Sequence, residues 1–162
     1  MPDLLAYRRH VLQALQFADI IKVSDEDLVH LDLPQSGARE KARTLLDATQ
    51  AQFLILTCGA DGASVLTRHG ETFSAREAMP LQVKDTVGAG DCFLAGLVCA
   101  YLDLGLDTSW GRTSVPQTQA KKLLQYAIAC ASICVSRQGC EPPTLEDVVQ
   151  RIREQPAHFL TV

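Results

Sequence analysis

The chain has 162 residues, of which 47% are hydrophobic and 21% are charged, and its formal net charge is −4. This composition is typical of a single soluble globular domain that can bury a sizeable core. The mildly acidic balance argues against a nucleic-acid partner, and no apolar run reaches the length that spans a bilayer, so a membrane partner is not expected either.

The cysteines and histidines do not follow disulfide or metal-binding patterns. None of the six cysteines belongs to a C-x-x-C pair, and most lie within apolar runs. We interpret them as buried thiols of a reducing compartment and therefore expect a cytoplasmic protein. The four histidines are scattered along the chain, and their spacing does not indicate a zinc site.

The first predicted elements alternate between helix and strand. Residues 3–17 have apolar residues at helical spacing, and residues 18–23 form a short apolar run that predicts a buried parallel strand. Ser24 begins a second helix, with Asp27 three residues later in a near-capping-box pattern that alone accounts for both residues. Residues 38–49 predict an amphipathic helix.

A second buried strand leads into a glycine-rich turn. Residues 53–57 predict the strand, and residues 58–62, which include two glycines, predict the turn that ends it. Residues 63–67 and 71–74 then predict a β-hairpin. The turn could offer backbone N–H groups to phosphate oxygens, although an ordinary tight turn accounts for the same residues.

A stretch of small residues marks the centre of the chain. Gly88, Ala89 and Gly90 precede Asp91 and an apolar run, residues 92–104, that predicts a buried helix. A helix N-terminus carries unpaired N–H donors and partial positive charge, so a small-residue turn there predicts an anion site. Asp91 could then accept a proton from an attacking hydroxyl. The same pattern also fits a plain tight turn with Asp91 as the N-cap residue.

The rest of the chain completes an alternating pattern. A polar loop around Trp110 is followed by an apolar helix at residues 118–135, a loop at residues 136–140 and a short helix from Thr144 to about Ile152. Strands alternating with helices predict an α/β fold with a mostly parallel sheet. Ligands bind at the carboxyl ends of the strands in such sheets, where both glycine-rich turns are expected.

Two familiar nucleotide-binding motifs are absent from the sequence. There is no G-x-x-x-x-G-K-[ST] segment, which excludes a Walker phosphate loop. The residues from Gly88 begin like G-x-G-x-x-G, but Phe93 occupies the third glycine position and Asp91 would face a pyrophosphate. The sequence therefore argues against a dinucleotide-binding fold.

The stretch from Asp85 to Phe93 closely resembles the signature of the ribokinase-like (PfkB) carbohydrate kinases. Residues 18–27, 57–62 and 126–139 resemble further stretches of that family in the same order, the first being most similar to the fructokinase branch. The resemblance covers residues 1–162 as a single α/β domain, but only the C-terminal part of the family. It implies a three-layer ribokinase-like fold with a mostly parallel sheet, lacking the family's N-terminal half and β lid.

The resemblance also implies an activity and a set of site residues. The activity is ATP-dependent phosphate transfer to a sugar hydroxyl, with Asp91 as the base that contacts the sugar and the N–H groups of Gly88, Ala89, Gly90 and Asp91 as the anion hole. The nucleotide would lie along Ser24, Asp27, Thr57, Gly59, Asp61 and Gly62, and near Ile128, which stands where many members have an asparagine.

The same resemblance implies residues that would bind metal ions. Asp27 stands where the family has a glutamate that helps to organise Mg²⁺ and phosphate. Asp85 and the carbonyl oxygen of Val87 would hold a monovalent cation such as K⁺.

A second hypothesis follows from the part of the family that this chain does not match. That part supplies most sugar contacts, and its absence would leave a strand edge and an apolar face exposed. The alternative is therefore a non-catalytic domain that binds an adenine nucleotide or pairs with another chain, including a second copy of itself.

Overall fold

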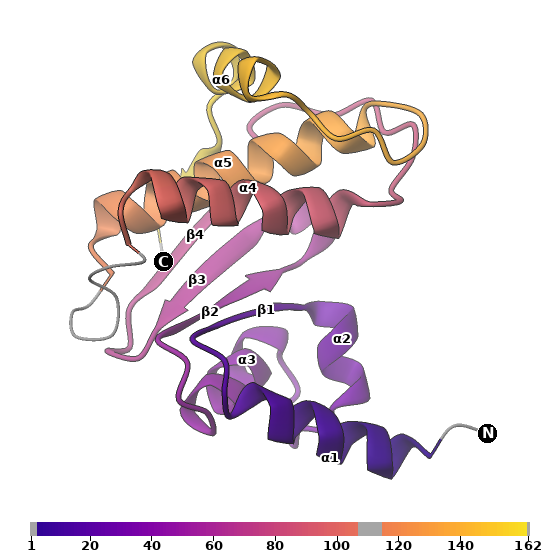
Figure 1. The fold of residues 1–162 in the computed structure, drawn as a ribbon, viewed down its shortest axis with the longest axis vertical. Helices are drawn as coiled ribbons and strands as arrows, with labels where there is room; N and C mark the ends of the chain where they lie inside the picture. The colour runs from indigo at the N-terminus through magenta and orange to yellow at the C-terminus, as the bar shows by residue number, and fades with distance from the viewer. Residues whose placement is uncertain (1–2, 107–114, 162) are drawn as a thin grey trace.

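The computed structural model describes residues 3–106 and 115–161, which form three layers (Figure 1). The middle layer is a five-stranded sheet, and helices cover both of its faces. The three-layer α/β architecture expected from the sequence is thereby confirmed. The predicted polar loop around Trp110 lies outside the described residues.

The sheet has the strand order β1-β2-β3-β4-β5, with bounds Ile20–Ser24, Phe53–Thr57, Ala63–Thr67, Thr72–Arg76 and His158–Leu160. β1 and β2 are parallel, whereas the other three neighbouring pairs are antiparallel. This part of the sheet is therefore mixed rather than mostly parallel. Short connections account for the pairs β2–β3 and β3–β4, because a turn of a few residues can join only antiparallel strands, whereas β5 comes from a distant part of the chain. β5 was not predicted, since three residues carry no readable alternation.

The helices divide between the two faces of the sheet (Figure 1). One face carries α1 (Leu4–Leu15), α2 (Asp25–His30) and α3 (Ala38–Asp47), and the other carries α4 (Ala89–Asp103), α5 (Gln117–Val135) and α6 (Leu145–Glu154). Every predicted helix is present within a few residues of its expected bounds. α4 begins three residues before the predicted apolar run, because the small residues themselves make its first turn.

Strand alternation divides the apolar side chains between two cores. On β2, Phe53 and Ile55 face the core beneath α4 and α5, while Leu54 and Leu56 face the core beneath α1 to α3. Ile21 and Val23 of β1 also belong to the second core. Because successive side chains of a strand point to opposite faces, Lys22 and Ser24 project toward the layer that contains α4.

The sequence predicted α4 as a buried helix, but in the structure only one side of α4 is buried. Its inner face includes Gly96, where a Cβ would approach the Cys130 sulfur of α5 to 2.6 Å, so the two helices pack closely. Its outer face carries Leu94, Val98 and Leu102, which are 41%, 45% and 55% exposed. A helix of strongly apolar composition is therefore covered on one side only by the described chain. None of the described helices is long and apolar enough to cross a membrane.

A partly buried ionic cluster holds α5 and α6 against the segment that follows β4. One carboxylate oxygen of Glu77 accepts a hydrogen bond from the Ser132 hydroxyl at 2.5 Å and pairs with the Arg151 guanidinium at 2.9 Å. The segment is further fixed where the Lys84 N–H donates to the Val135 carbonyl at 2.8 Å. These contacts fix the direction in which the chain enters the glycine turn before α4.

Candidate active site

The turn before α4 is built on a glycine that no other residue could replace without strain. Gly88 is the N-cap residue and has a φ of 79°, in the left-handed region. A Cβ at this position would also overlap the Cys140 sulfur, which lies against the turn. The turn therefore depends on Gly88 both for its backbone conformation and for the close approach of Cys140.

Most of the backbone donors at the start of α4 are available to a ligand. The Ala89 N–H donates to the Thr86 carbonyl at 3.2 Å, which removes one of the four expected anion-hole donors. The N–H groups of Gly88, Gly90 and Asp91 have no hydrogen-bond acceptor among the described residues. Unsatisfied donors at a helix N-terminus, together with the positive end of the helix dipole, favour an anion.

Asp91 lies in the first turn of α4 and is exposed. The N-cap position belongs to Gly88, so the interpretation of Asp91 as the N-cap residue is wrong. Its carboxylate makes no hydrogen bond or ion pair within the described part of the chain. It therefore stands beside the available N–H donors, and its structural role is limited to the favourable interaction of a first-turn carboxylate with the helix dipole.

Asp85, in contrast, has a structural role. One of its oxygens accepts the Val87 N–H at 3.0 Å and the other accepts the Gly139 N–H at 3.1 Å, which ties the turn to the loop after α5. The Val87 carbonyl faces the Cys134 thiol at 3.7 Å. Each oxygen keeps a second lone pair, so these groups fit a monovalent cation as two of several ligands. Among the described residues no group of three or more His, Cys, Asp or Glu forms a metal site.

The carboxyl ends of β1 and β2 bring two further predicted residues together. Ser24 and Thr57 are partners across the parallel pair, and the Thr57 hydroxyl donates to the Val23 carbonyl at 3.5 Å. Figure 1 shows this end of β1 on the same side of the molecule as the start of α4. The sequence-based expectation that both strands end near the small-residue turn is thus supported by their position in the fold.

The residues after β2 that were predicted to bind the nucleotide form a short 3₁₀ helix. Gly59 and Asp61 are exposed in this helix (Gly59–Asp61), and Gly62 ends it with a φ of 90°. A Cβ at Gly62 would overlap the Ala75 carbonyl of β4. Gly62 is therefore required for packing against β4, independently of any ligand.

Asp27 forms the predicted capping box with Ser24. Its Oδ2 accepts the Ser24 N–H, and its own N–H donates to the Ser24 hydroxyl, both at 3.0 Å. The backbone N–H of Ser24, followed by its hydroxyl, lowers the pKa of Asp27 below the usual carboxyl value. Oδ1 has no hydrogen-bond partner among the described residues, so an ionised carboxylate oxygen remains for a cation such as Mg²⁺.

Ile128 is only 7% exposed and belongs to the core between α5 and the sheet. Packing accounts for its apolar side chain, and its place beside the nucleotide stays a prediction.

Lys22 is the residue at this site that sequence analysis missed. Its Nζ lies 3.6 Å from the position that a Cβ on Gly90 would occupy. The signal was present in the sequence, because Lys22 interrupts an apolar strand two residues before Ser24 and so faces the same side. Lys22 lies within the stretch at residues 18–27 that resembles the family, but the approach of α4 to its side chain could not be read from the chain.

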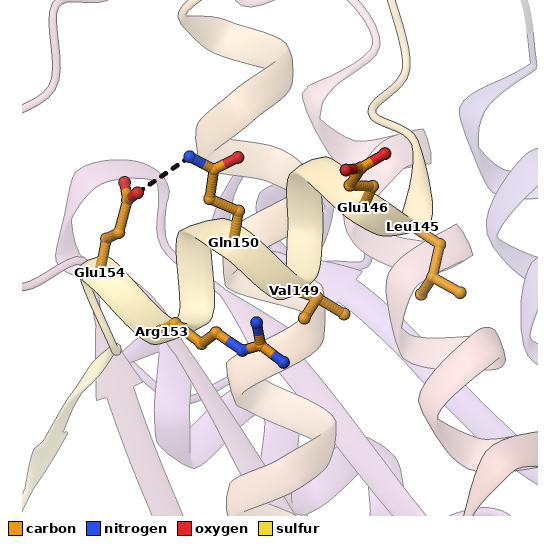
Figure 2. Close-up of a pocket in the computed structure, with 6 residues that line it drawn as sticks. All are labelled: Leu145, Glu146, Val149, Gln150, Arg153 and Glu154. Carbon is orange, nitrogen blue, oxygen red and sulfur yellow. Dashed lines mark hydrogen bonds between the residues drawn. The ribbon is translucent and has the colours of Figure 1, made fainter.

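A surface hollow elsewhere on the molecule lacks the features of a site. It has a volume of about 710 Å³ and lies along α6 (Figure 2). All of its lining side chains come from this one helix, and Gln150 donates to Glu154 at 2.9 Å. No groups from other elements converge on it, in contrast to the turn before α4.

Comparison with known proteins identifies the family to which the chain belongs. Residues 1–147 match the model of the pfkB family of carbohydrate kinases. The chain is 31% identical over 145 residues to the protein named Probable fructokinase-6, chloroplastic, of Arabidopsis thaliana, covering 87% of this chain and 35% of the relative. It is 29% identical over 130 residues to the Fructokinase of Salmonella thompson, covering 78% of this chain and 53% of the relative.

The fold is shared with a solved structure described as a ribokinase II of Escherichia coli in complex with ATP and Mg²⁺. The two agree with a TM-score of 0.73 at 25% sequence identity, over 94% of this chain and 44% of that one. The chain thus spans between about a third and about half of the relatives it matches. The chain belongs to the pfkB family of carbohydrate kinases, and its ribokinase-like fold is confirmed.

Proposed function

We propose that this chain forms the ATP side of a kinase that transfers the γ-phosphoryl group of ATP to a hydroxyl of fructose or a similar keto or deoxy sugar. The observation that carries the proposal is the start of α4. Three N–H groups, on Gly88, Gly90 and Asp91, have no acceptor in the part of the chain that the structure describes, and they lie beside the exposed Asp91 carboxylate. Family membership and the fructokinase relatives support the reaction class and the choice of acceptor.

We assign the proposed residues two roles, stabilisation of the phosphoryl charge and removal of the sugar proton. The N–H groups at the start of α4 would bind the phosphoryl oxygens, whose charge is stabilised by fixed donors without reorganisation. Asp91 would take the proton of the attacking sugar hydroxyl. Ser24, Thr57, Gly59, Asp61 and Gly62 would lie along the nucleotide. Asp27 would hold Mg²⁺, which, when bound with ATP, neutralises phosphate charge, and Asp85 with the Val87 carbonyl would contribute to a K⁺ site.

Sugar selection and water exclusion are proposed to depend on the portion of the family that this chain does not span. A kinase must exclude water from the transferred group, or ATP is hydrolysed instead. The complete enzyme is therefore the form in which turnover should be measured. All six cysteines are unpaired, which supports the expectation of a reducing, cytoplasmic location, but Cys99 and Cys140 are exposed, so the interpretation of all six as buried thiols is wrong.

Replacement of the proposed base tests the function. In the complete enzyme, Asp91→Asn is expected to lower ATP-dependent sugar phosphorylation about a hundredfold to ten-thousandfold, the usual contribution of a general base. Asp103→Asn is the matched control, because Asp103 is an exposed carboxylate at the far end of the same helix. Circular dichroism should show both variants folded. Unchanged phosphorylation by a folded Asp91→Asn enzyme would contradict the proposal.

The alternative, a non-catalytic domain that pairs with another chain, is favoured by one specific observation. The apolar outer face of α4 is exposed, and β1 pairs only with β2 among the described strands. Both are surfaces that a second chain could cover. Calorimetry with ATP and Mg²⁺, followed by a coupled assay on a panel of sugars, separates the two candidates. Binding without turnover in every assembly that includes the chain would favour a non-catalytic domain that binds an adenine nucleotide or pairs with another chain.

A further inference from the structure

We propose that Cys134 and Cys140 form an oxidation site, in which a reversible disulfide between their sulfur atoms weakens anion binding at the start of α4. The inference rests on the proposed function for the identity of the anion, a phosphate group of the nucleotide. The positions of the two sulfurs, their difference in exposure and the hydrogen bonds that flank them each support it.

The sulfur atoms of both cysteines lie against the turn before α4. The Cys134 thiol donates to the Val87 carbonyl at 3.7 Å, and the Cys140 sulfur occupies the space that a Cβ on the next residue, Gly88, would fill. The Cys134 thiol also interacts with the Cys140 thiol. The two sulfurs therefore meet at adjacent residues of one turn, although one comes from the end of α5 and the other from the loop that follows it.

The two thiols differ in exposure, and this difference fits two successive steps. Cys140 is an exposed residue, whereas Cys134 is fully buried. An oxidant is therefore expected to react with Cys140 first, and Cys134 lies where its sulfur can attack the oxidised one. Cys92 also interacts with Cys134, but it is buried as well, so these two thiols are not expected to react first.

The proposed oxidation consumes one molecule of hydrogen peroxide. The Cys140 sulfur attacks one peroxide oxygen, the O–O bond breaks, and the products are a sulfenic acid and water. The Cys134 sulfur then attacks the Cys140 sulfur, which forms the S–S bond, breaks the S–O bond and releases a second water. The thiols lose two electrons and two protons in all, and the peroxide takes them up. A dithiol reductant reverses the reaction by exchange, as is usual for transient disulfides of reducing compartments.

Hydrogen bonds beside each cysteine connect the pair to the turn. The Val135 carbonyl, next to Cys134, accepts the Asp85 N–H at 3.3 Å. The Gly139 N–H, next to Cys140, donates to the Asp85 carboxylate at 3.1 Å. Asp85 is thus held from both sides by neighbours of the two cysteines, so a movement of one cysteine relative to the other acts on the turn through Asp85.

A disulfide would change both the shape of the turn and one of its hydrogen bonds. An S–S bond is about 2.05 Å long, much shorter than a contact between two separate thiols, so Cys134 and Cys140 must approach each other. The Cys134 sulfur also loses its hydrogen and can no longer donate to the Val87 carbonyl. The N–H groups that follow this turn at the start of α4 would then be displaced, and their affinity for a phosphate group would fall.

Peptide mass spectrometry tests whether the disulfide forms. Trypsin cleaves after Arg137, which separates Cys134, in the peptide 123–137, from Cys140, in the peptide 138–151. The full chain treated with hydrogen peroxide is expected to give these two peptides joined by a disulfide that dithiothreitol breaks. Fragmentation of the joined peptides distinguishes Cys134 from Cys130, the other cysteine of the first peptide.

Calorimetry with a non-hydrolysable ATP analogue and Mg²⁺ tests the effect on binding. The oxidised full chain is expected to bind the analogue about tenfold more weakly than the reduced chain, the loss of roughly one charged hydrogen bond, and dithiothreitol should restore the affinity. Cys140→Ser should bind equally before and after peroxide. Cys134→Ser leaves the oxidised Cys140 without a partner, so excess peroxide should convert it to a sulfinic acid and dithiothreitol should no longer restore binding.

The matched control is Cys99→Ser, because Cys99 is an exposed cysteine in the second half of α4. This variant should respond to peroxide and dithiothreitol as the wild type does. No joined peptide from the oxidised wild type, a disulfide that leaves analogue binding unchanged, or full recovery of Cys134→Ser would overturn the inference while leaving the proposed function intact. A reduced wild-type chain that binds no analogue would overturn both.

Discussion

Two glycine-rich turns of this chain have similar sequences but differ in how many of their backbone N–H groups donate within the turn. In the turn after β2, the N–H groups of Cys58, Asp61 and Gly62 donate to carbonyls within the turn at 2.8, 2.9 and 3.2 Å. In the turn before α4, the Ala89 N–H alone is used in this way among the four expected donors. Glycine content therefore does not define an anion site. Among the described residues, the N–H groups of Gly59 and Ala60 lack acceptors in the turn after β2, against three N–H groups before α4, and only the latter begin a long helix with its dipole behind them.

The largest effect is expected from adding one methyl group to the turn before α4. Gly88→Ala forces a left-handed conformation on alanine and overlaps the Cys140 sulfur, so unfolding free energy should fall by about 2–5 kcal/mol and nucleotide binding should be lost. Gly59→Ala in the other turn meets open space at a φ of 50° and should cost only about 1 kcal/mol. Urea titration and calorimetry measure both.

Cys140→Ala provides the internal control for this prediction. Combined with Gly88→Ala it should relieve the overlap with the sulfur and leave the backbone strain, about 1–2 kcal/mol, and a tight contact of 3.1 Å with the Cβ of residue 140. Equal costs for the alanine substitutions at Gly88 and Gly59 would show that the two turns do not differ as proposed.

An intermediate effect is expected from the carboxylate that holds the turn before α4. Asp85→Ala removes the acceptors of the Val87 and Gly139 N–H groups and should cost about 1–3 kcal/mol of unfolding free energy. Asp61→Ala is the matched change in the other turn. The Asp61 side chain is exposed and accepts no hydrogen bond among the described residues, so its loss should be within about 0.5 kcal/mol. A larger loss for Asp61→Ala in urea titration would reverse the comparison.

The smallest effect is expected on the pH dependence of the unfolding free energy, through the Asp27 carboxylate that follows β1. Because the pKa of Asp27 is lowered in the folded chain, its stabilising contribution is present above the ordinary carboxyl range, about pH 4, and is lost as pH falls through the lowered value. Asp27→Asn should therefore flatten the acid side of the stability profile, by less than about 1 kcal/mol since the group is exposed.

Urea titrations at about pH 6 and about pH 3 measure this change. Asp47→Asn is the control, an exposed carboxylate of α3 whose replacement should leave the profile unchanged. An identical profile for wild type and Asp27→Asn would mean that the capping box does not depend on the charge of Asp27.

Local patterns predicted local structure well in this chain. The capping box of Ser24 and Asp27, the two parallel strands and the turn at Gly88 all depend on residues within a few positions of each other. β5 could not be predicted, because a three-residue strand forms only when β4 is already in place to pair with it. The hairpin of β3 and β4 was predicted, whereas the antiparallel addition of β5 joins distant segments and could not be read from the strand-helix alternation.

The parts of the site that sequence analysis missed depend on contacts between distant segments. Ile128 matched a family position, but only packing against the sheet shows that it is core. Lys22 looked like an interruption of a strand until α4 was seen to approach it. The engagement of the Ala89 N–H depends on the geometry of the Thr86 carbonyl rather than on residue identity. Likewise, the exposed face of α4 could not be read from its uniformly apolar sequence.

The contact between Cys140 and the turn before α4 has a practical consequence for handling the protein. Cys140 is an exposed residue, so peroxide or an alkylating reagent is expected to reach its side chain. Any group added to that sulfur must compete with Gly88 for the same space. Samples stored without a reductant are therefore expected to lose nucleotide binding while their circular dichroism spectrum is still that of the native fold.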